Sequence, residues 1–200
     1  MSELETLAAA VAKCTQCLLH QGRTKAVPGE GPENANIMFI GEAPGFHEDQ
    51  QGRPFVGAAG KFLDELLDTI GLKRESVYIT NVIKCRPPGN RDPLPEEIAA
   101  CKPYIDRQIE LIQPTLVVTL GRFSMARAFP KARISRIHGQ PRKIEGVVYY
   151  PMYHPAAALH QPSLRRTVEE DMLRIPELIE QAAQMAETEL PSQAEQLKLF

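Results

Sequence analysis

Four cysteines are the residues whose type and spacing point most directly to chemistry. Cys14 and Cys17 form a CxxC pair. Cys85 begins the proline-rich loop CRPPGNRDPLPEE, and Cys101 follows that loop. The chain contains no other cysteine. The N-terminus has neither the basic nor the apolar region of an export signal, so we expect a cytoplasmic protein. In that compartment such cysteines indicate metal or redox chemistry rather than disulfides.

Two kinds of metal group accept this set of ligands. Four thiolates bind a structural zinc ion, and four thiolates equally bind a four-iron four-sulfur cluster. The CxxC pair alone is a weak signal, and the two further cysteines make it considerably stronger. The spacing does not choose between zinc and iron. The alternative without a metal is four buried thiols that pack as small apolar groups.

Two loops carry a second group of chemically capable residues. The segment GEAPG at 41–45 combines glycines with backbone N–H groups, which allows close approach to a ligand. The segment HPAA begins at His154. Each also has an ordinary structural explanation, as a turn between a strand and a helix or as a hydrogen-bonding histidine. The two segments indicate a ligand site only if the fold brings them together.

Alternating strands and helices would position these loops. Apolar β-rich runs predict strands at 36–41, 77–84, 115–121 and 147–154, and helical spacing predicts helices at 58–70, 95–112, 162–174 and 176–186. This alternation is typical of an α/β fold with a parallel sheet, in which ligands bind at the carboxyl ends of the strands. We therefore expect Gly41, the segment 81–85, Gly121 and His154 along one edge of the molecule.

The charge is distributed unevenly along the chain. The net charge is −2, yet the last 33 residues are strongly acidic and the segment 122–143 holds basic residues without any acid. A basic surface favours a polyanionic partner, although a solvated basic face explains the same pattern. The residues from which we expect such contacts are Arg122, Arg127, Arg133, Arg136, Arg142 and Lys143. No run of eighteen apolar residues predicts a membrane span, so we expect no membrane partner.

Several motifs in order resemble one protein family. GEAPG at 41–45, GRPFVG at 52–57, ITNVIKCRPPGNRDP at 79–93 and HPAA at 154–157 resemble the bacterial and archaeal iron–sulfur uracil-DNA glycosylases of family four. The resemblance implies a three-layer α/β/α sandwich around a four-stranded parallel sheet, in a domain that we place at residues 1–187. It also implies a four-iron four-sulfur cluster held by Cys14, Cys17, Cys85 and Cys101.

The resemblance further implies hydrolysis of the N-glycosidic bond of deoxyuridine in DNA, which leaves an abasic site and begins base excision repair. The departing uracil carries negative charge, so a hydrogen-bond donor to a uracil oxygen favours the reaction. His154 resembles that donor, Asn81 the amide that pairs with the uracil edge, and Phe55 the aromatic ring that stacks on the base. Gly41 and Ala43 belong to the same expected pocket.

Two other functions compete with this one. The first is a non-catalytic protein that binds uracil or damaged DNA with the same fold; the presence of both Asn81 and His154 argues against it. The second is a module stabilised by zinc or a cluster that has no role with nucleic acids.

The residue that positions the attacking water is open. The family-one enzymes of the wider superfamily have an aspartate where this chain has Ala43. Glu42 and Glu48 are the candidates for positioning water, and Asn90 is the candidate for assisting at the sugar. Glu48 is also a candidate for excluding the methyl group of thymine.

The base must leave the duplex to enter such a pocket. Leu159, just beyond HPAA, is the candidate wedge that fills the vacated space. Ser163, Arg165 and Arg166 are the candidates for contacts with nearby phosphates.

The last residues, 188–200, are expected to form a flexible tail. Its final pentapeptide, QLKLF, resembles the peptide by which bacterial replication and repair proteins bind the sliding clamp. Gln196, Leu197, Leu199 and Phe200 would make the contacts, in the manner of a short peptide in a groove. The alternative is that the apolar residues fold back onto the domain. We expect the protein to be a monomer.

Overall fold

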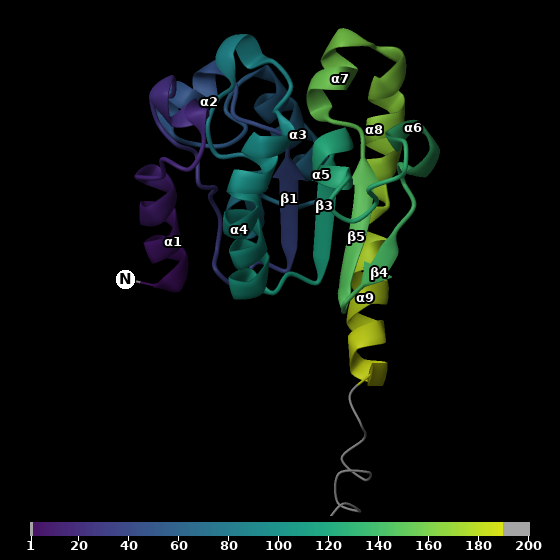
Figure 1. Ribbon diagram of the computed structural model, residues 1–200. Helices are drawn as coiled ribbons and strands as arrows, with labels where there is room; N and C mark the ends of the chain where they lie inside the picture. The colour runs from purple at the N-terminus through teal and green to yellow at the C-terminus, as the bar shows by residue number, and fades with distance from the viewer. Residues whose placement is uncertain (1, 190–200) are drawn as a thin grey trace, which may run out of the picture.

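The computed structural model describes residues 2–189 and contains one five-stranded sheet (Figure 1). In spatial order its strands are β2 (Tyr78–Asn81), β1 (Ile37–Gly41), β3 (Leu116–Leu120), β5 (Val147–Met152) and β4 (Arg142–Ile144). The first four run parallel. The predicted α/β class and all four predicted strands are therefore confirmed.

The sheet has one strand more than predicted. β4 pairs antiparallel with β5, with Lys143 opposite Val148. Glu145 and Gly146 connect the two strands, and both have positive φ, 50° and 83°. This conformation is typical of a two-residue hairpin turn. A strand of three residues is too short for a periodic signal, which is why the sequence showed only its positive charge.

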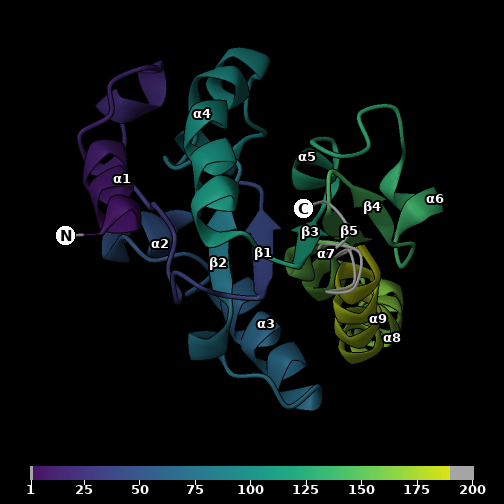
Figure 2. The ribbon, with the colours of Figure 1, turned by 90° about the horizontal axis from the view of Figure 1, so that it is seen from below.

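Two layers of helices cover the sheet (Figure 2). The helices α3 (Ala58–Thr69), α8 (Ser163–Leu173) and α9 (Ile175–Glu189) lie on one face, and α1 (Glu3–Ala12) and α4 (Pro95–Ile112) lie on the other. Side chains alternate along the strands, so Phe39 packs into the first core while Met38 and Ile40 pack into the second. This is the three-layer sandwich that the resemblance implied.

Local sequence accounts for the long helices. The buried side of α3 is the predicted apolar stripe, which includes Phe62 and Leu66. α4 begins at Pro95, whose ring fits the first turn, and the Glu97 carboxylate accepts the backbone N–H of Leu94 at 2.8 Å. Both α4 ends lie where predicted. α9 extends to Glu189, two residues into the range expected as a tail; residues 190–200 lie outside the described residues.

Short helices fill the connections that the sequence left as loops. They are α2 (Phe46–Gln51), α5 (Arg122–Met125), α6 (Ile134–Ile137), α7 (Pro155–His160) and the 3₁₀ helices η1 (Leu18–Gln21), η2 (Arg74–Ser76) and η3 (Pro88–Asn90). Each is shorter than two turns, too short for the helical period to be recognised. Among residues 2–189, no helix combines the length and apolar character needed to cross a membrane.

β2 ends at Asn81, three residues before the predicted end at Lys84. The Lys84 ammonium group is fully buried and donates to the backbone carbonyl of Asn81 at 2.8 Å and to the Thr80 hydroxyl at 2.6 Å. These bonds reach back three and four residues, so the chain turns here instead of extending. The turn begins the segment that leads to Cys85.

Candidate active site

The predicted edge of the sheet exists. Gly41 and Asn81 are the last residues of β1 and β2 and pair with each other in the sheet. Gly121 follows β3, and His154 lies between β5 and α7. All four lie at the carboxyl ends of parallel strands, and this edge of the sheet is uppermost in Figure 1.

A cavity of about 170 Å³ opens at this edge. It is lined by Ala43, Gly45, Glu48, Phe55, Ala59, Asn81, His154 and Ala156. We call it the Asn81 cavity. Asn81 is 2% exposed, and its Oδ1 atom is buried without a hydrogen-bond partner. Since buried polar atoms are nearly always paired, this oxygen marks a place where a ligand supplies the donor.

Gly41 allows the side chains of Asn81 and Phe55 to approach the end of β1. A Cβ atom at this position would lie 2.4 Å from Asn81 Oδ1 and 2.6 Å from Phe55 Cζ. Both distances are far shorter than any van der Waals contact. Glycine is therefore required here by packing, and the predicted membership of Gly41 in the pocket is indirect: it makes room for the residues that line it.

Phe55 lies over one side of the cavity in an uncommon backbone conformation. Its φ is 50°, in the left-handed region, which costs a residue other than glycine about 1–3 kcal/mol. Its ring is nearly parallel to the imidazole of His154, with 5.4 Å between the ring centroids and 23° between the planes. The sequence analysis predicted both aromatic rings for one pocket, and the structure brings them together.

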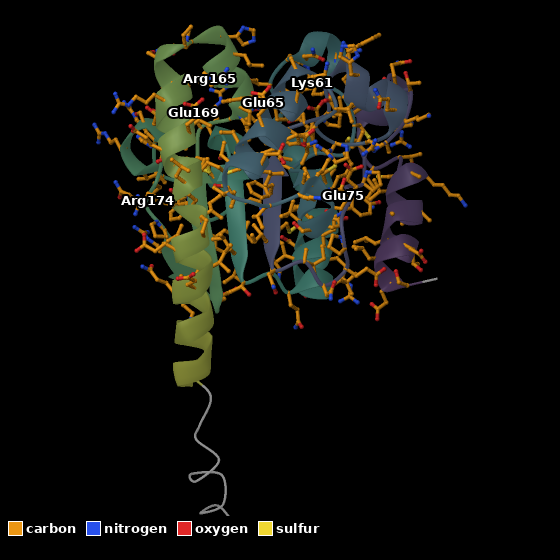
Figure 3. All side chains as sticks on the ribbon, turned by 180° about the vertical axis from the view of Figure 1, so that it is seen from behind. Lys61, Glu65, Glu75, Arg165, Glu169 and Arg174 are labelled. Carbon is orange, nitrogen blue, oxygen red and sulfur yellow. The ribbon has the colours of Figure 1, made fainter. Side chains whose placement is uncertain are left out.

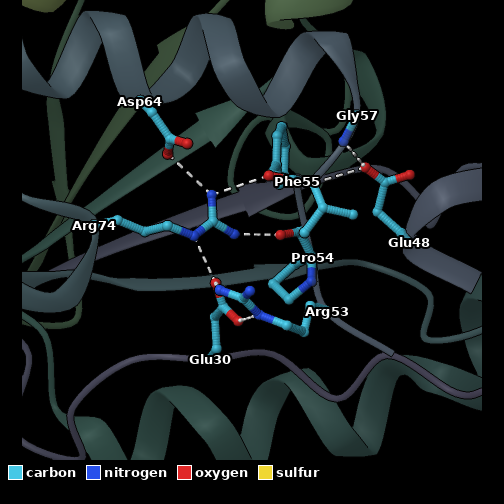
Figure 4. A network of polar contacts seen from close by, with 9 residues as sticks. Glu30, Glu48, Arg53, Pro54, Phe55, Gly57, Asp64 and Arg74 are labelled. Atoms are coloured by element: carbon cyan, nitrogen blue, oxygen red, sulfur yellow. Dashed lines mark hydrogen bonds and ion pairs between the residues drawn. The ribbon is translucent and has the colours of Figure 1, made fainter. Parts of the chain in front are cut away.

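Glu48 holds the loop that carries Phe55 (Figure 4). Its Oε1 atom accepts the backbone N–H groups of Val56 and Gly57, both at 2.9 Å, and its Oε2 atom accepts that of Gly45 at 3.1 Å. Glu48 thus lines the cavity as predicted. Its carboxylate already binds three backbone donors, which favours a positioning role over the activation of water.

His154 is neutral and has a defined tautomer. Its Nδ1 atom accepts the backbone N–H of Ala156 at 3.1 Å, so the ring proton resides on Nε2. Burial lowers the pKa of His154 to about 4, a shift that the negative charge of Glu48 opposes. The imidazole is therefore an uncharged N–H donor at neutral pH. Gly121, with φ +90°, leaves space for it, since a Cβ there would lie 3.2 Å from the His154 Cβ.

A second cavity of about 290 Å³ adjoins the first. It is lined by Glu42, Ala43, Pro44, Gly45, Pro87, Asn90, Arg91, His154 and Ala156, and we call it the Asn90 cavity. Burial raises the pKa of Glu42; Asp92 raises it further and Arg122 opposes the shift. Asn90 Oδ1 accepts a hydrogen bond from Arg86 Nε at 2.7 Å. Glu42, a predicted water-positioning candidate, and Asn90, the candidate for assisting at the sugar, thus share one cavity with His154.

The four cysteines meet at a separate place, beside α4 and the N-terminal segment. They line one small cavity together, with Cys85 and Cys101 buried and Cys14 and Cys17 partly exposed. Burial raises the pKa of the Cys101 thiol to about 11. Among the described residues, no group of three or more His, Cys, Asp or Glu is arranged to hold a metal ion as the side chains stand.

Arg23 contributes the charged contact of this cysteine-lined cavity. Its Nη1 atom lies 3.1 Å from Cys85 Sγ, and its Nη2 atom donates to the carbonyl oxygen of Ala12 at 2.8 Å. Burial raises the pKa of the Cys85 thiol, while the bond to Arg23 acts in the opposite direction. The guanidinium thus joins the N-terminal helix α1 to the thiol of Cys85, in the segment that follows β2.

Comparison with known proteins decides the family. A family model described as the uracil DNA glycosylase superfamily matches residues 28–175. The chain belongs to this superfamily. The type-4 uracil-DNA glycosylase of Sulfurisphaera tokodaii is 50% identical over 188 residues, which cover 89% of this chain and 86% of the relative. Those of Archaeoglobus fulgidus (48% over 187 residues; 89% and 94%) and Thermotoga maritima (46% over 174 residues; 84% and 91%) are similar as well. The predicted type-4 family is confirmed.

The residues of this uracil-DNA glycosylase that are predicted to contact DNA differ in exposure and in ion pairing. Leu159 is 42% exposed on α7, the helix that His154 caps. Arg165 pairs with Glu169 at 2.9 Å and Arg166 with Glu170 at 2.7 Å, each one turn further along α8 (Figure 3 labels the first pair). Both arginines are therefore partly neutralised. The i,i+4 spacing of these charges was visible in the sequence. Ser163 is the exposed first residue of α8.

The basic segment of the glycosylase is not one uniform surface. Arg127 is largely buried and pairs with Asp106 of α4 at 2.6 Å, and Arg122 forms an ion pair with Asp92. The guanidinium carbon of Arg142 lies over the Phe129 ring, 5.2 Å from the ring centroid. Arg133 and Arg136 are exposed. The sequence could not separate these roles, since Asp92 and Asp106 are distant along the chain.

Several residues that line the two cavities of the glycosylase are not predicted by their type in the sequence. Gly45, Ala59 and Ala156 line the Asn81 cavity, and Pro87 and Arg91 line the Asn90 cavity. All but Ala59 lie inside motifs that were recognised. Gly45, Ala59 and Ala156 have small side chains, so residue type alone gives these positions no chemical signal, and Arg91 is paired with Glu97 at 2.6 Å.

Proposed function

We propose that this protein hydrolyses the N-glycosidic bond of deoxyuridine in DNA, releasing uracil and leaving an abasic site that begins base excision repair. The observation that carries the proposal is the Asn81 cavity. In it, an unpaired buried amide oxygen faces the same space as a neutral imidazole donor and a phenylalanine ring. A planar base with a hydrogen-bonding edge matches this combination.

His154 would supply the catalytic hydrogen bond. As the glycosidic bond breaks, negative charge develops on the uracil oxygens, and the Nε2–H group of His154 can donate to one of them. The donor is held in place before the reaction because Ala156 fixes the tautomer. A neutral donor gains more from the developing charge than from the neutral substrate, so it stabilises the transition state selectively.

Asn81 would select uracil over cytosine. Its amide offers one acceptor and one donor, which match the N3–H group and the adjacent carbonyl of uracil. Cytosine presents an acceptor and an amino group in these positions, so the same amide orientation opposes two like groups. An unpaired polar group in a closed site is costly, and this cost provides the discrimination.

The reaction also requires the base to leave the helix and water to reach the sugar. We assign the wedge to Leu159 because it is exposed on α7, the helix that His154 caps. We assign the positioning of water to Glu42 and Asn90, which line the Asn90 cavity beside His154. Ser163 and the exposed basic residues would contact phosphates.

We further propose that the four cysteines hold a four-iron four-sulfur cluster. All four line one cavity, and their thiol groups are the ligands that such a cluster uses. Each cysteine of the cluster binds a different iron, so the sulfurs need not converge on one point as they do around a single zinc ion. When bound, the cluster would supply a structural cross-link. It would join the Cys14–Cys17 segment to Cys85, in the segment after β2, and to Cys101 of α4.

The test of the main proposal is a gel assay with a uracil-containing oligonucleotide. Alkali cleaves abasic sites, so uracil excision appears as a shorter labelled strand. Matched oligonucleotides with cytosine or thymine should remain intact, and the His154→Ala protein, purified in parallel, controls for contaminating activity. Binding to the uracil oligonucleotide without any strand cleavage would favour the non-catalytic alternative and refute the proposal.

We also propose that the C-terminal pentapeptide docks on a bacterial sliding clamp. We further propose that the protein is cytoplasmic and acts as a monomer. Gln196, Leu197, Leu199 and Phe200 lie outside the described residues, so this proposal is supported by the sequence alone. A chain ending at residue 195 should lose clamp binding in a pull-down while it cleaves a short uracil oligonucleotide as before. Clamp binding by the shortened chain would refute the docking.

A further inference from the structure

Arg74 lies beside the loop that carries Phe55 (Figure 4). It begins η2, just before β2, and its side chain is 14% exposed. Its Nη1 atom donates to the carbonyl oxygen of Phe55 at 3.0 Å, and its Nη2 atom donates to that of Pro54. One guanidinium group therefore binds two consecutive carbonyls of this loop.

Two acidic residues hold the guanidinium in this position. Arg74 Nε donates to Glu30 at 2.6 Å, and Nη1 also donates to Asp64 of α3 at 3.0 Å. Burial acts to raise the pKa of Glu30, but the hydrogen bonds from Arg53 and Arg74 lower it below its ordinary value. The carboxylate thus remains ionised at neutral pH and anchors the far side of the guanidinium.

The peptide group between Phe55 and Val56 is bound at both ends. Arg74 donates to its oxygen at 3.0 Å, and Glu48 accepts its N–H at 2.9 Å (Figure 4). These two bonds orient the peptide that follows Phe55, and the bond from Arg74 Nη2 to the Pro54 carbonyl orients the peptide that precedes it. Together they hold Phe55 in its left-handed conformation, with φ 50°. That conformation directs the ring toward His154.

We propose that Arg74 is a positioning residue for uracil excision: it holds the Phe55 backbone so that the ring covers the Asn81 cavity. This inference rests on the proposed function, because it assigns Phe55 to the stacking of the base. The fork of the guanidinium is essential to the role. A lysine has a single ammonium group, which cannot reproduce the planar arrangement of donors to two carbonyls and two carboxylates.

The chain offers a matched control. Arg53 also binds Glu30, at 2.7 and 3.2 Å, but its side chain is 57% exposed, and the carbonyls of Pro54 and Phe55 are bound by Arg74 instead. Arg74→Met and Arg53→Met each remove one positive charge beside the same carboxylate. Only the first removes the support of the Phe55 peptide.

We expect Arg74→Met to lower the single-turnover rate of uracil excision by roughly tenfold to a hundredfold, the scale of a small misplacement of a reacting group. Arg53→Met should change this rate by less than about twofold. Affinity for a DNA duplex with an abasic site should remain unchanged in both, since the base pocket is empty in that complex. A loss of rate that is equal in both variants would show a general effect of charge and overturn the proposal.

A double-mutant cycle tests whether Arg74 acts through Phe55. In a Phe55→Ala background, Arg74→Met should add little, because the ring that it positions is already gone. Rate losses that multiply independently would overturn the proposal. If Arg74→Met does not fold, Arg74→Lys replaces it as the test variant because it keeps the positive charge. An undiminished rate of uracil excision in Arg74→Lys would refute the requirement for the guanidinium fork.

Amide hydrogen exchange separates this inference from the proposed function. Arg74→Met should accelerate exchange at Val56 and Gly57, while Arg53→Met should leave both as in the unmodified protein. This readout needs no catalysis. If the unmodified protein excises no uracil, the proposed function fails whatever the exchange shows. If it excises uracil and neither exchange nor rate responds to Arg74→Met, the positioning role alone fails.

Discussion

The backbone N–H of Ala156 donates to Nδ1 of His154 at 3.1 Å. His154 is thereby both the N-cap of α7 and the nitrogen donor of the Asn81 cavity. The two roles support each other: capping requires Nδ1 without a proton, and that requirement leaves the proton on Nε2. The geometry of one short helix thus sets the chemical state of the group assigned to catalysis.

The first prediction concerns the protonation of His154. Its pKa of about 4 lies below the ordinary value for histidine, so the unfolded chain binds the proton first as the pH falls. The neutral ring therefore contributes stability that is fully present above about pH 6.5 and is lost as the pH falls toward 4. Nitrogen NMR of the ring should show the Nε2–H tautomer throughout pH 6–8; a titration near pH 6.5 would contradict this.

Removal of the His154 donor should lower the rate of excision. We expect His154→Asn to reduce the single-turnover rate by roughly a hundredfold to a thousandfold, as loss of a preorganised donor does. Asparagine retains an oxygen that can cap α7, so stability should change by less than about 1 kcal/mol. The measurement pairs quench-flow cleavage with thermal unfolding. A near-normal rate would show that His154 serves only the helix.

Exchange of the Asn81 amide for a carboxylate should damage selection. Asn81→Asp replaces a donor and an acceptor by acceptors alone, so uracil excision should fall roughly tenfold to a hundredfold. Cytosine presents an amino group that a carboxylate can accept, and excision of cytosine should become detectable. Rates on uracil and cytosine oligonucleotides of one sequence measure both effects. An unchanged ratio between the two bases would exclude Asn81 from selection.

Loss of one cysteine should affect stability before selectivity. Cys101→Ala removes one of the four proposed ligands and leaves the Asn81 cavity untouched, so the melting temperature and iron content should fall while the preference for uracil over cytosine persists. Iron and sulfide analysis of the unmodified protein should give four of each per chain, with a brown colour, the composition of such a cluster. Colourless protein with one zinc per chain would contradict the assignment.

DNA binding should weaken steeply with salt because phosphate contacts release counterions. Arg133→Ala and Arg136→Ala should each reduce the slope of log affinity against log salt by about one if that residue contacts a phosphate. Lys102→Ala is the control of equal charge: it is exposed on α4 and pairs with Asp106. Equal slopes for all three variants would remove Arg133 and Arg136 from the DNA surface.

The sequence by itself determined the four parallel strands, both ends of α4 and the edge at which Gly41, Asn81 and His154 meet. Apolar runs of strand length and an 18-residue helical period are strong local signals, and parallel strands must all present their carboxyl ends at one edge. The resemblance then named the residues of that edge. It could do so because whole motifs, and not single residues, identify a family.

Only the tertiary structure decided how these residues are held. Glu48 binds the amides at 56 and 57, Arg74 binds the carbonyls at 54 and 55, and Asp106 neutralises Arg127. Each bond joins residues 8 to 21 positions apart, beyond the reach of helix or strand periodicity. The tautomer and pKa of His154 likewise follow from one backbone donor and from burial. Such contacts depend on where loops pass in space, and no local pattern encodes that path.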